Sequence, residues 1–293
     1  MRLTGKTAAI VAPAGIPDMN NIARSIELLE SWGLKVVMGK HVADPFRYMA
    51  ARNEERAADL CWALSDPSID IVWAARGGYG SVHCLASLPF SVPCAKTVIG
   101  FSDVTSLFCA LQSVPNVRLI HGPSLNGLAV KVDDATRASI LHLLSGDPPH
   151  PIALRRLHGS AGPVEGRMGG GNITVLASIA GTRWQARWND AIVLLEDVTE
   201  LAYRIDRSIT QLKESRSLDG ARAFVLGDFI RCDLPADADF TLEEMLVDLL
   251  RPFDVPIFAG YPVGHGATNL SWEYGARVAI GSDDVIRQTS GES

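Results

Sequence analysis

Hydrophobic and polar positions in the first half of the chain alternate between two patterns. Short apolar, often β-branched runs predict buried strands at residues 7–12, 34–39, 69–75, 97–101 and 117–122. The longer segments between them include two with helical spacing of apolar residues. Asp18 is expected to cap a helix that runs to Trp32, and Pro67 is expected to close a second helix over residues 47–65. Strands that alternate with helices predict βαβ units around a parallel sheet.

The alternation breaks at residues 146–166, which are dense in proline and glycine and have no sustained period. We expect a linker there, between an N-terminal domain (1–145) and a C-terminal domain (167–293). In the second half, the pattern predicts strands at 191–196, 221–229, 255–260 and 276–281, and helices at 172–181, 204–217 and 241–250. A Thr241/Glu244 capping box begins the last helix. The whole chain is predicted to be α/β, with the strand order of the second half left open.

Composition narrows the class of protein. The chain has 293 residues, of which 47% are hydrophobic and 20% charged, so it can bury a sizeable core. Its 27 basic and 33 acidic residues give a net charge of −6, which disfavours nucleic-acid or anionic-membrane partners and suits a small-molecule substrate. The N-terminus lacks a signal-peptide pattern, so a cytoplasmic location is expected.

The five cysteines are odd in number and never form CxxC, which argues against a disulfide framework and against a zinc site. We expect reduced, mostly buried thiols. The spacing of Cys, His and Asp residues suggests no metal, and no cofactor is expected.

The strongest candidate nucleophile is Ser102, between the strand at 97–101 and a helical run at 104–112. A serine there is exposed at the carboxyl edge of the sheet, and the free N–H groups of the helix can stabilise an anion. The arrangement follows the logic of a nucleophile elbow, although the GxSxG form is missing. The alternative is that Ser102 or Asp103 only caps the helix.

A serine nucleophile needs a base, and a base needs an orienting carboxylate. His265 lies in a glycine-rich loop, GYPVGHGATN, after a strand, and is the first choice; His121, after another strand, is the second. Glu196 ends the apolar run 191–196 and is the preferred carboxylate. Its neighbours Asp197 and Glu200 are alternatives.

Two glycine-rich segments offer backbone N–H groups. RGGYG, residues 76–80, follows a strand and can supply an oxyanion hole beside Ser102, or else form a tight turn or a phosphate-binding loop. GGGN, residues 169–172, can form an anion-binding nest, although Asn172 as a helix N-cap explains it equally well.

Several of these segments together resemble the LD-carboxypeptidase family. The segments that carry the resemblance, in order, are RGGYGSVHCL, IGFSDVTSL, HGP, GGNITVLASIAGT, VLLEDVTELAYRIDRSITQL and GYPVGHGATN. The family includes cytoplasmic murein tetrapeptide carboxypeptidases and the related microcin C immunity peptidases. The resemblance implies an N-terminal parallel-sheet α/β domain, like that of class I glutamine amidotransferases, with a smaller C-terminal α/β domain. It also implies a homodimer.

Carried over residue by residue, the resemblance implies Ser102 as nucleophile, His265 as general base and acid, and Glu196 as the orienting carboxylate. It implies an oxyanion hole made by the backbone N–H groups of Gly78 and Asp103. The expected reaction is serine-type hydrolysis of an LD-peptide bond in a peptidoglycan fragment, releasing the terminal D-alanine.

A carboxypeptidase must also recognise the free carboxylate of its substrate. Arg76, Arg204 and Arg207 are the cations nearest the motifs, with Arg76 and Arg204 retained as candidates, although each can instead form a structural ion pair.

Three other functions stay open. A microcin-type peptidase would stack an aromatic side chain on the nucleobase of a nucleotide-like substrate. Candidates for that side chain are Trp184, Trp188 and Trp272. A ligand-binding protein without activity would show a broken triad, and a glutamine-amidotransferase-like hydrolase would need a cysteine at the position of Ser102.

Overall fold

The computed structural model describes residues 3–89, 91–160 and 162–289 and divides them into two compact units. Unit 1 contains residues up to 147 together with 270–274, and unit 2 contains residues 148–269 together with 275 onward. Neither unit is a single continuous stretch of chain. Among the helices of the described residues, none is long and apolar enough to cross a bilayer.

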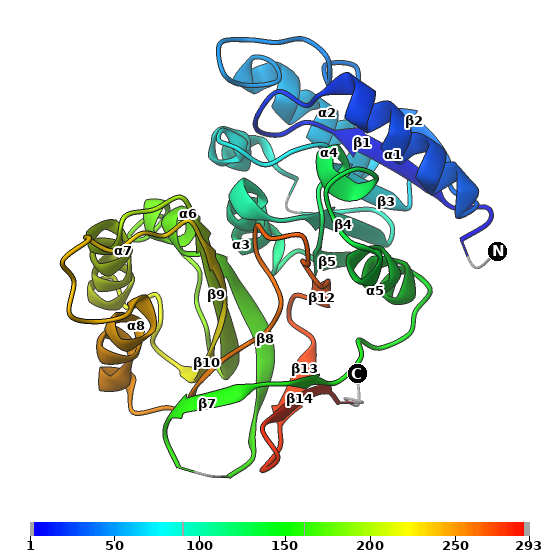
Figure 1. The fold of residues 1–293 in the computed structure, drawn as a ribbon. Coiled ribbons are helices and arrows are strands. Elements are labelled where there is room, and N and C mark those ends of the chain that lie inside the picture. The colour runs from blue at the N-terminus through cyan, green and yellow to red at the C-terminus, as the bar shows by residue number, and fades with distance from the viewer. Residues whose placement is uncertain (1–2, 90, 161, 290–293) are drawn as a thin grey trace. The chain divides into compact units, whose positions relative to one another are not determined.

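The sheet of unit 1 has the predicted parallel strands. Its order is β12-β5-β4-β3-β1-β2, in which only β12 is antiparallel to its neighbour (Figure 1). The strands are β1 (Thr7–Val11), β2 (Lys35–Met38), β3 (Ile71–Ala74), β4 (Lys96–Gly100), β5 (Val117–His121) and β12 (Trp272–Glu273). All five predicted N-terminal strands are confirmed. β12 was not predicted, because two residues that come from late in the chain give no pattern.

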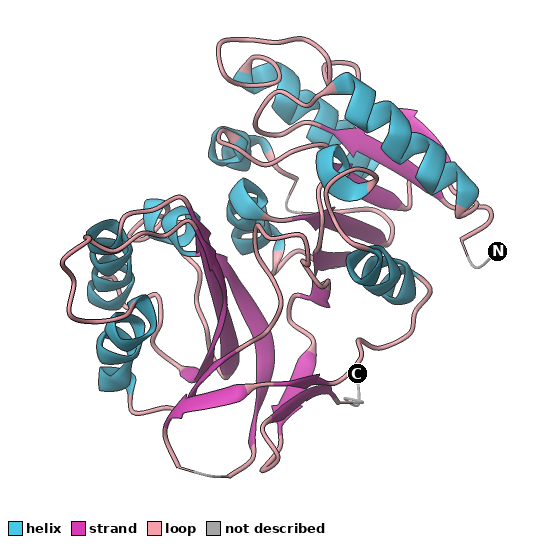
Figure 2. Cartoon of the chain, viewed as in Figure 1, coloured by secondary structure: helices cyan, strands magenta, loops and turns pink. Residues whose placement is uncertain are grey.

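Helices cover the sheet of unit 1 and bury its apolar core (Figure 2). They are α1 (Met19–Ser31), α2 (Asn53–Ser65), α3 (Thr105–Leu111), α4 (Leu125–Leu128) and α5 (Asp134–Leu144), with the 3₁₀ turns η1 (Ser81–Ser87) and η2 (Ser102–Val104). Asp18 caps α1 as expected. The second predicted helix starts later than residue 47, because the Glu55 side chain accepts the N–H of Arg52 and fixes the helix start there.

Unit 2 contains a mixed sheet of order β6-β14-β13-β8-β9-β10-β11-β7, in which β8 to β11 are parallel. The strands are β6 (Ile152–Ala153), β7 (Arg155–His158), β8 (Val164–Asn172), β9 (Ala191–Val198), β10 (Ala221–Ile230), β11 (Ile257–Ala259), β13 (Arg277–Ile280) and β14 (Val285–Gln288). Helices α6 (Ile173–Ser178), α7 (Ala202–Glu214) and α8 (Leu242–Leu250), followed by η3 (Arg251–Phe253), lie on one side of β8–β10 (Figure 2). The Thr241/Glu244 capping box is present.

Residues 146–166, where a linker was expected, are not a bare linker. They contain β6, β7 and the first residues of β8, and the chain enters unit 2 at Pro148. β6 and β7 are short strands at the two edges of the sheet, where proline and glycine are tolerated, so their composition does not distinguish them from a linker.

β8 escaped prediction because glycines fill its second half. A Cβ on Gly170 would lie 1.8 Å from the Leu194 carbonyl oxygen, and one on Gly169 would meet the ring of Trp188. The glycines therefore allow β9 and Trp188 to approach the backbone closely, and GGGN belongs to a strand.

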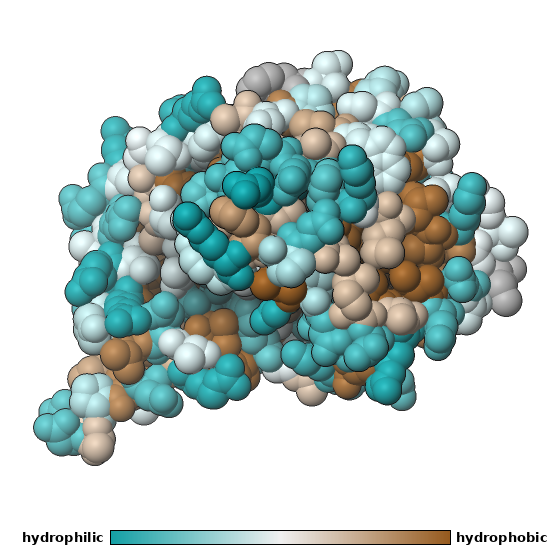
Figure 3. Space-filling view, turned by 90° about the horizontal axis from the view of Figure 1, so that it is seen from above, coloured by the Kyte–Doolittle hydropathy of each residue, from teal (hydrophilic) through white to brown (hydrophobic). Residues whose placement is uncertain are grey.

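The exposed surface mixes residue types. Figure 3 shows a face on which hydrophilic and hydrophobic residues are interspersed. Among the exposed apolar side chains are Tyr48 and Tyr79, whose ring centroids are 6.3 Å apart. Tyr79 belongs to the RGGYG loop, so an aromatic pair borders that loop.

Candidate active site

Ser102 lies in a tight turn between β4 and α3. It begins η2, and its φ is 62°, in the left-handed region. A non-glycine residue in that region costs about 1–3 kcal/mol, and such residues cluster at active sites. The backbone therefore has the strained strand-to-helix turn typical of a nucleophile, without the GxSxG sequence.

The RGGYG loop lies against this serine, as the sequence predicts. A Cβ on Gly77 would be 3.0 Å from Ser102 Cβ and 3.1 Å from Ser102 Oγ. Gly78 has a φ of 109°, which glycine adopts without strain. The glycine at position 77 therefore allows the loop backbone to approach the serine closely, whereas a Cβ on Gly78 would lie 3.3 Å from the Cα of Gly15.

The Asp103 carboxylate joins the serine turn to the end of the RGGYG loop. It is buried and accepts hydrogen bonds from Ser81 N (2.8 Å) and Ser81 Oγ (2.5 Å). Burial raises the pKa of Asp103. The sequence suggested Asp103 as a source of a backbone N–H or as a helix cap, so the bond of its side chain to Ser81 was missed.

A second contact missed from the sequence is made by Arg56, a residue that is only 2% exposed. It donates to the carbonyl oxygens of Gly80 (2.8 Å), Ala51 (3.1 Å) and Pro13. Arg56 therefore ties the loop after β1 to the loop after β3. The available signal was its place on the buried face of α2, four residues before Leu60.

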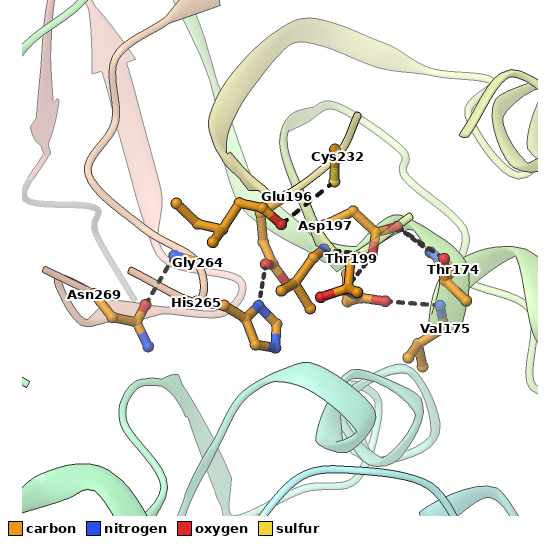
Figure 4. Close-up of polar contacts among 12 residues, drawn as sticks. Thr174, Val175, Glu196, Asp197, Thr199, Cys232, Gly264, His265 and Asn269 are labelled. Carbon is orange, nitrogen blue, oxygen red and sulfur yellow. Dashed lines mark hydrogen bonds and ion pairs between the residues drawn. The ribbon is translucent and has the colours of Figure 1, made fainter. Parts of the chain in front are cut away.

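Glu196 and His265 meet within unit 2 (Figure 4). Glu196 lies near the end of β9 and is fully buried, and its Oε2 is 2.8 Å from His265 Nδ1. The His265 side chain is 19% exposed. The carboxylate orients the imidazole through Nδ1, which makes Nε2 the atom suited to exchange a proton with a substrate. The predicted pairing of the orienting carboxylate, Glu196, with the histidine base, His265, is therefore present in the structure.

Glycines and an amide hold the His265 loop in place. Gly264 has a φ of 140°, and a Cβ on it would lie 3.3 Å from Glu196 Oε2. The Gly264 N–H donates to Asn269 Oδ1 at 3.2 Å, as Figure 4 shows. The close approach of the loop to Glu196 thus depends on glycine beside the histidine.

The alternative carboxylates have other partners. Asp197 accepts hydrogen bonds from Asn172 Nδ2 (3.0 Å), Thr174 N (3.0 Å) and Thr174 Oγ1 (2.8 Å). Asn172 also accepts the N–H of Val175 and is the N-cap of α6, so the N-cap interpretation of GGGN is confirmed. Glu200 forms an ion pair with Arg204.

The candidate cations differ in their partners. Arg76 donates through Nη1 to the Ile16 carbonyl oxygen at 2.6 Å. Arg204 Nη1 lies 3.6 Å from Glu200 Oε2, and the Arg207 guanidinium lies over the ring of Tyr203. Arg204 therefore has a carboxylate partner, whereas Arg76 is bonded to a backbone carbonyl.

The second-choice base and two of the three tryptophans are buried. His121 is fully buried and stacks on Trp272, with ring centroids 5.1 Å apart. Trp188 is 3% exposed and packs over Gly169. Trp184 is less buried, and the Arg183 guanidinium lies 4.5 Å from its ring centroid. Their burial leaves His121, Trp188 and Trp272 poorly placed to reach a substrate.

The structure thus brings the candidate residues together in two sets. In unit 1, Ser102 and Asp103 share one turn that lies against Gly77, the residue before Gly78, and in unit 2, Glu196 and His265 form a hydrogen-bonded pair.

Comparison with known proteins covers both units. Residues 8–122 match the LD-carboxypeptidase N-terminal domain, and residues 165–280 match the LD-carboxypeptidase C-terminal domain. The murein tetrapeptide carboxypeptidase of Pseudomonas aeruginosa is 35% identical over 285 residues, covering 93% of this chain and 92% of that protein. The microcin C7 self-immunity protein MccF of Escherichia coli is 26% identical, covering 93% and 89%.

Solved structures extend the likeness to the fold. The crystal structure of muramoyltetrapeptide carboxypeptidase from Oxalobacter formigenes superimposes with a TM-score of 0.85 at 28% identity, covering 96% of this chain and 97% of that one. Two matched domains and near-complete coverage of relatives at this identity lead to one conclusion: the chain belongs to the LD-carboxypeptidase family.

Proposed function

We propose that this protein is a serine LD-carboxypeptidase that removes the terminal D-alanine from murein tetrapeptide. The observation that carries the proposal is the Glu196–His265 pair at 2.8 Å, in a chain 35% identical to a murein tetrapeptide carboxypeptidase. The left-handed Ser102 in its strand-to-helix turn supports the same reading.

In the proposed mechanism, His265 takes the hydroxyl proton of Ser102 while Oγ attacks the carbonyl carbon that precedes D-alanine. The resulting oxyanion accepts hydrogen bonds from the backbone N–H groups of Gly78 and Asp103. His265 then gives the proton to the leaving amine and D-alanine departs. A water activated by His265 hydrolyses the acyl-enzyme and regenerates Ser102.

Glu196 keeps the imidazole in the required tautomer and stabilises the imidazolium that forms during each proton transfer. Its full burial makes that stabilisation strong, because little solvent screens the pair. In this proposal the substrate carboxylate is received by Arg76, which has no ion-pair partner among the described residues, rather than by Arg204, which pairs with Glu200.

The family resemblance supports two further parts of the proposal, a homodimer and a cytoplasmic location. Light scattering coupled to size-exclusion chromatography measures the first, and fractionation of cells that express the chain measures the second. A monomer or an exported protein would contradict the respective part.

The decisive experiment measures D-alanine release from a UDP-linked murein tetrapeptide by the unaltered protein, Ser102→Ala and Ser113→Ala. Ser113 is an exposed serine just after α3, so its substitution is the matched control. We expect release by the unaltered protein and by Ser113→Ala, and a loss of at least about 10⁴-fold in Ser102→Ala. Equal release by all three would contradict the role of Ser102.

The second candidate function is cleavage of an aminoacyl-nucleotide conjugate, favoured by the 26% identity to MccF. An aminoacyl sulfamoyl adenosine tested in parallel separates the two. Turnover of that compound alone would move the protein to the immunity branch, and turnover of neither compound would favour a ligand-binding protein.

A further inference from the structure

One acidic residue beside the Glu196–His265 pair is not used in the proposed mechanism. Asp228 lies in β10, which pairs with β9 in parallel register up to Leu226 and Leu195. The pairing resumes at Phe229 and Asp197, so β10 has one extra residue there. Gly227 and Asp228 therefore form a β-bulge opposite Glu196. Bulges next to active sites redirect a side chain.

The bulge places Asp228 against the loop that carries the histidine. Asp228 N donates to the Val263 carbonyl oxygen at 2.8 Å. A Cβ on Gly266 would lie 3.2 Å from Asp228 Oδ2, and a Cβ on Gly264 would lie 3.2 Å from Asp228 Cβ. Asp228 thus occupies the space that a side chain would need at either glycine flanking His265, and the Glu196 carboxylate occupies part of that space at Gly264.

The Asp228 carboxylate has no hydrogen-bond or ion-pair partner among residues 3–89, 91–160 and 162–289. It is half-buried, and burial raises its pKa. A partly desolvated charge without a partner destabilises the folded protein, and such residues are concentrated at binding and catalytic sites. On the neighbouring strand, Glu196 Oε2 pairs with His265 and the Asp197 carboxylate accepts hydrogen bonds from Asn172 and Thr174, so each of these carboxylates already has a protein partner.

We propose that Asp228 is a specificity-determining residue that binds a cationic ammonium group on the substrate residue preceding the scissile bond. The inference rests on the proposed function, because it assigns a subsite next to the same histidine. In murein tetrapeptide that residue is meso-diaminopimelate, whose side chain ends in a centre that carries a free ammonium group. A carboxylate that lacks a donor from the protein matches that chemistry.

Three tetrapeptides test the subsite: their third residue is meso-diaminopimelate, L-lysine or L-norleucine, and only the last lacks the ammonium. For Asp228→Asn, we expect kcat/KM to fall about 10- to 100-fold on the first two, mainly through KM, with the norleucine peptide unchanged. Asp228→Glu should recover part of the loss. Asp237→Asn, at an exposed aspartate, is the matched control and should change nothing.

An equal loss on all three peptides would overturn the inference, because Asp228 would then act by positioning the His265 loop. No loss on any peptide would overturn it as well. A binding measurement by calorimetry separates this inference from the proposed function. Ser102→Ala should bind the lysine peptide more tightly than Ser102→Ala/Asp228→Asn, with equal binding of the norleucine peptide.

If the unaltered protein released no D-alanine but this difference in binding persisted, the proposed function would fail and the ammonium subsite would stand. If turnover occurred and the difference in binding were absent, the subsite would fail and the proposed function would stand.

Discussion

The surroundings of Ser102 in unit 1 consist mainly of backbone, whereas those of His265 in unit 2 depend on a side-chain hydrogen bond. Ser102 is held by a left-handed φ and by the close approach of Gly77. His265 is oriented by one buried carboxylate at 2.8 Å. From this comparison we expect Ser102 to be disturbed by added volume at Gly77. We expect His265 to be disturbed by loss of the Glu196 charge, even when the volume of that side chain is kept.

The largest effect in this comparison is expected for Glu196→Gln, which keeps the shape but removes the charge. The amide does not stabilise the imidazolium and can favour the wrong tautomer, so kcat should fall by about 10³- to 10⁴-fold. Rates of D-alanine release measure it, and thermal unfolding checks that the variant is folded. A loss smaller than tenfold would show that D-alanine release does not depend on the charge of Glu196.

Gly77→Ala adds one methyl group beside the nucleophile. Because that methyl would lie 3.0 Å from Ser102 Cβ, the serine or the loop must shift, and we expect kcat/KM to fall by about 10²-fold. Gly162→Ala is the matched control, since a Cβ there meets no atom within 4 Å. Similar rates for the two variants would mean that volume near Ser102 is unimportant.

Asp103→Asn tests a charge inside the backbone-built region. Because burial raises the pKa of Asp103, the folded chain keeps this proton at pH values where the unfolded chain has lost it. The contribution of Asp103 to the free energy of unfolding therefore declines as pH rises from its unfolded pKa through its folded pKa.

The Tm difference between the unaltered protein and Asp103→Asn, measured from pH 3 to pH 7, should accordingly shift against the unaltered protein as pH rises. Asp237→Asn provides the reference for an exposed carboxylate. A shift in the opposite direction would mean that the Ser81 hydrogen bonds outweigh desolvation at Asp103.

The smallest effect is expected away from both regions. Thr241→Ala removes the side chain that caps α8 and should cost about 1 kcal/mol of folding free energy. This corresponds to a Tm lower by roughly 2–4 °C, with D-alanine release unchanged. Thr210→Ala, at an exposed position inside α7, should leave Tm nearly unaltered. Reduced activity in Thr241→Ala would mean that the cap of α8 supports the Glu196–His265 pair.

The sequence was most informative where a local pattern determines structure. The five parallel strands of unit 1, the Asp18 cap and the Thr241/Glu244 box each follow from neighbouring residues. Ser102, Glu196 and His265 stand near strand ends, and the predicted pairing of Glu196 with His265 is present in the structure.

The missed features depend on residues far apart in sequence. The sequence of β8 resembles a loop because of its glycines. These glycines are needed to make room for Leu194 and Trp188, which lie more than 15 residues away in the chain. The role of Arg56 depends on its contacts with Pro13 and Gly80, which are 43 and 24 residues away in the chain. The Asp228 carboxylate became a candidate only through the bulge in β10, which is a property of two strands together.

The return of residues 270–274 to unit 1 has a consequence for the order of synthesis. β12 pairs with β5, and Trp272 stacks on His121, but these residues leave the ribosome only after residues 148–269 of unit 2. The outer side of β5 therefore stays unpaired while most of unit 2 is being translated. An uncovered strand edge is prone to intermolecular pairing, so the nascent chain is expected to be most vulnerable to aggregation during that interval.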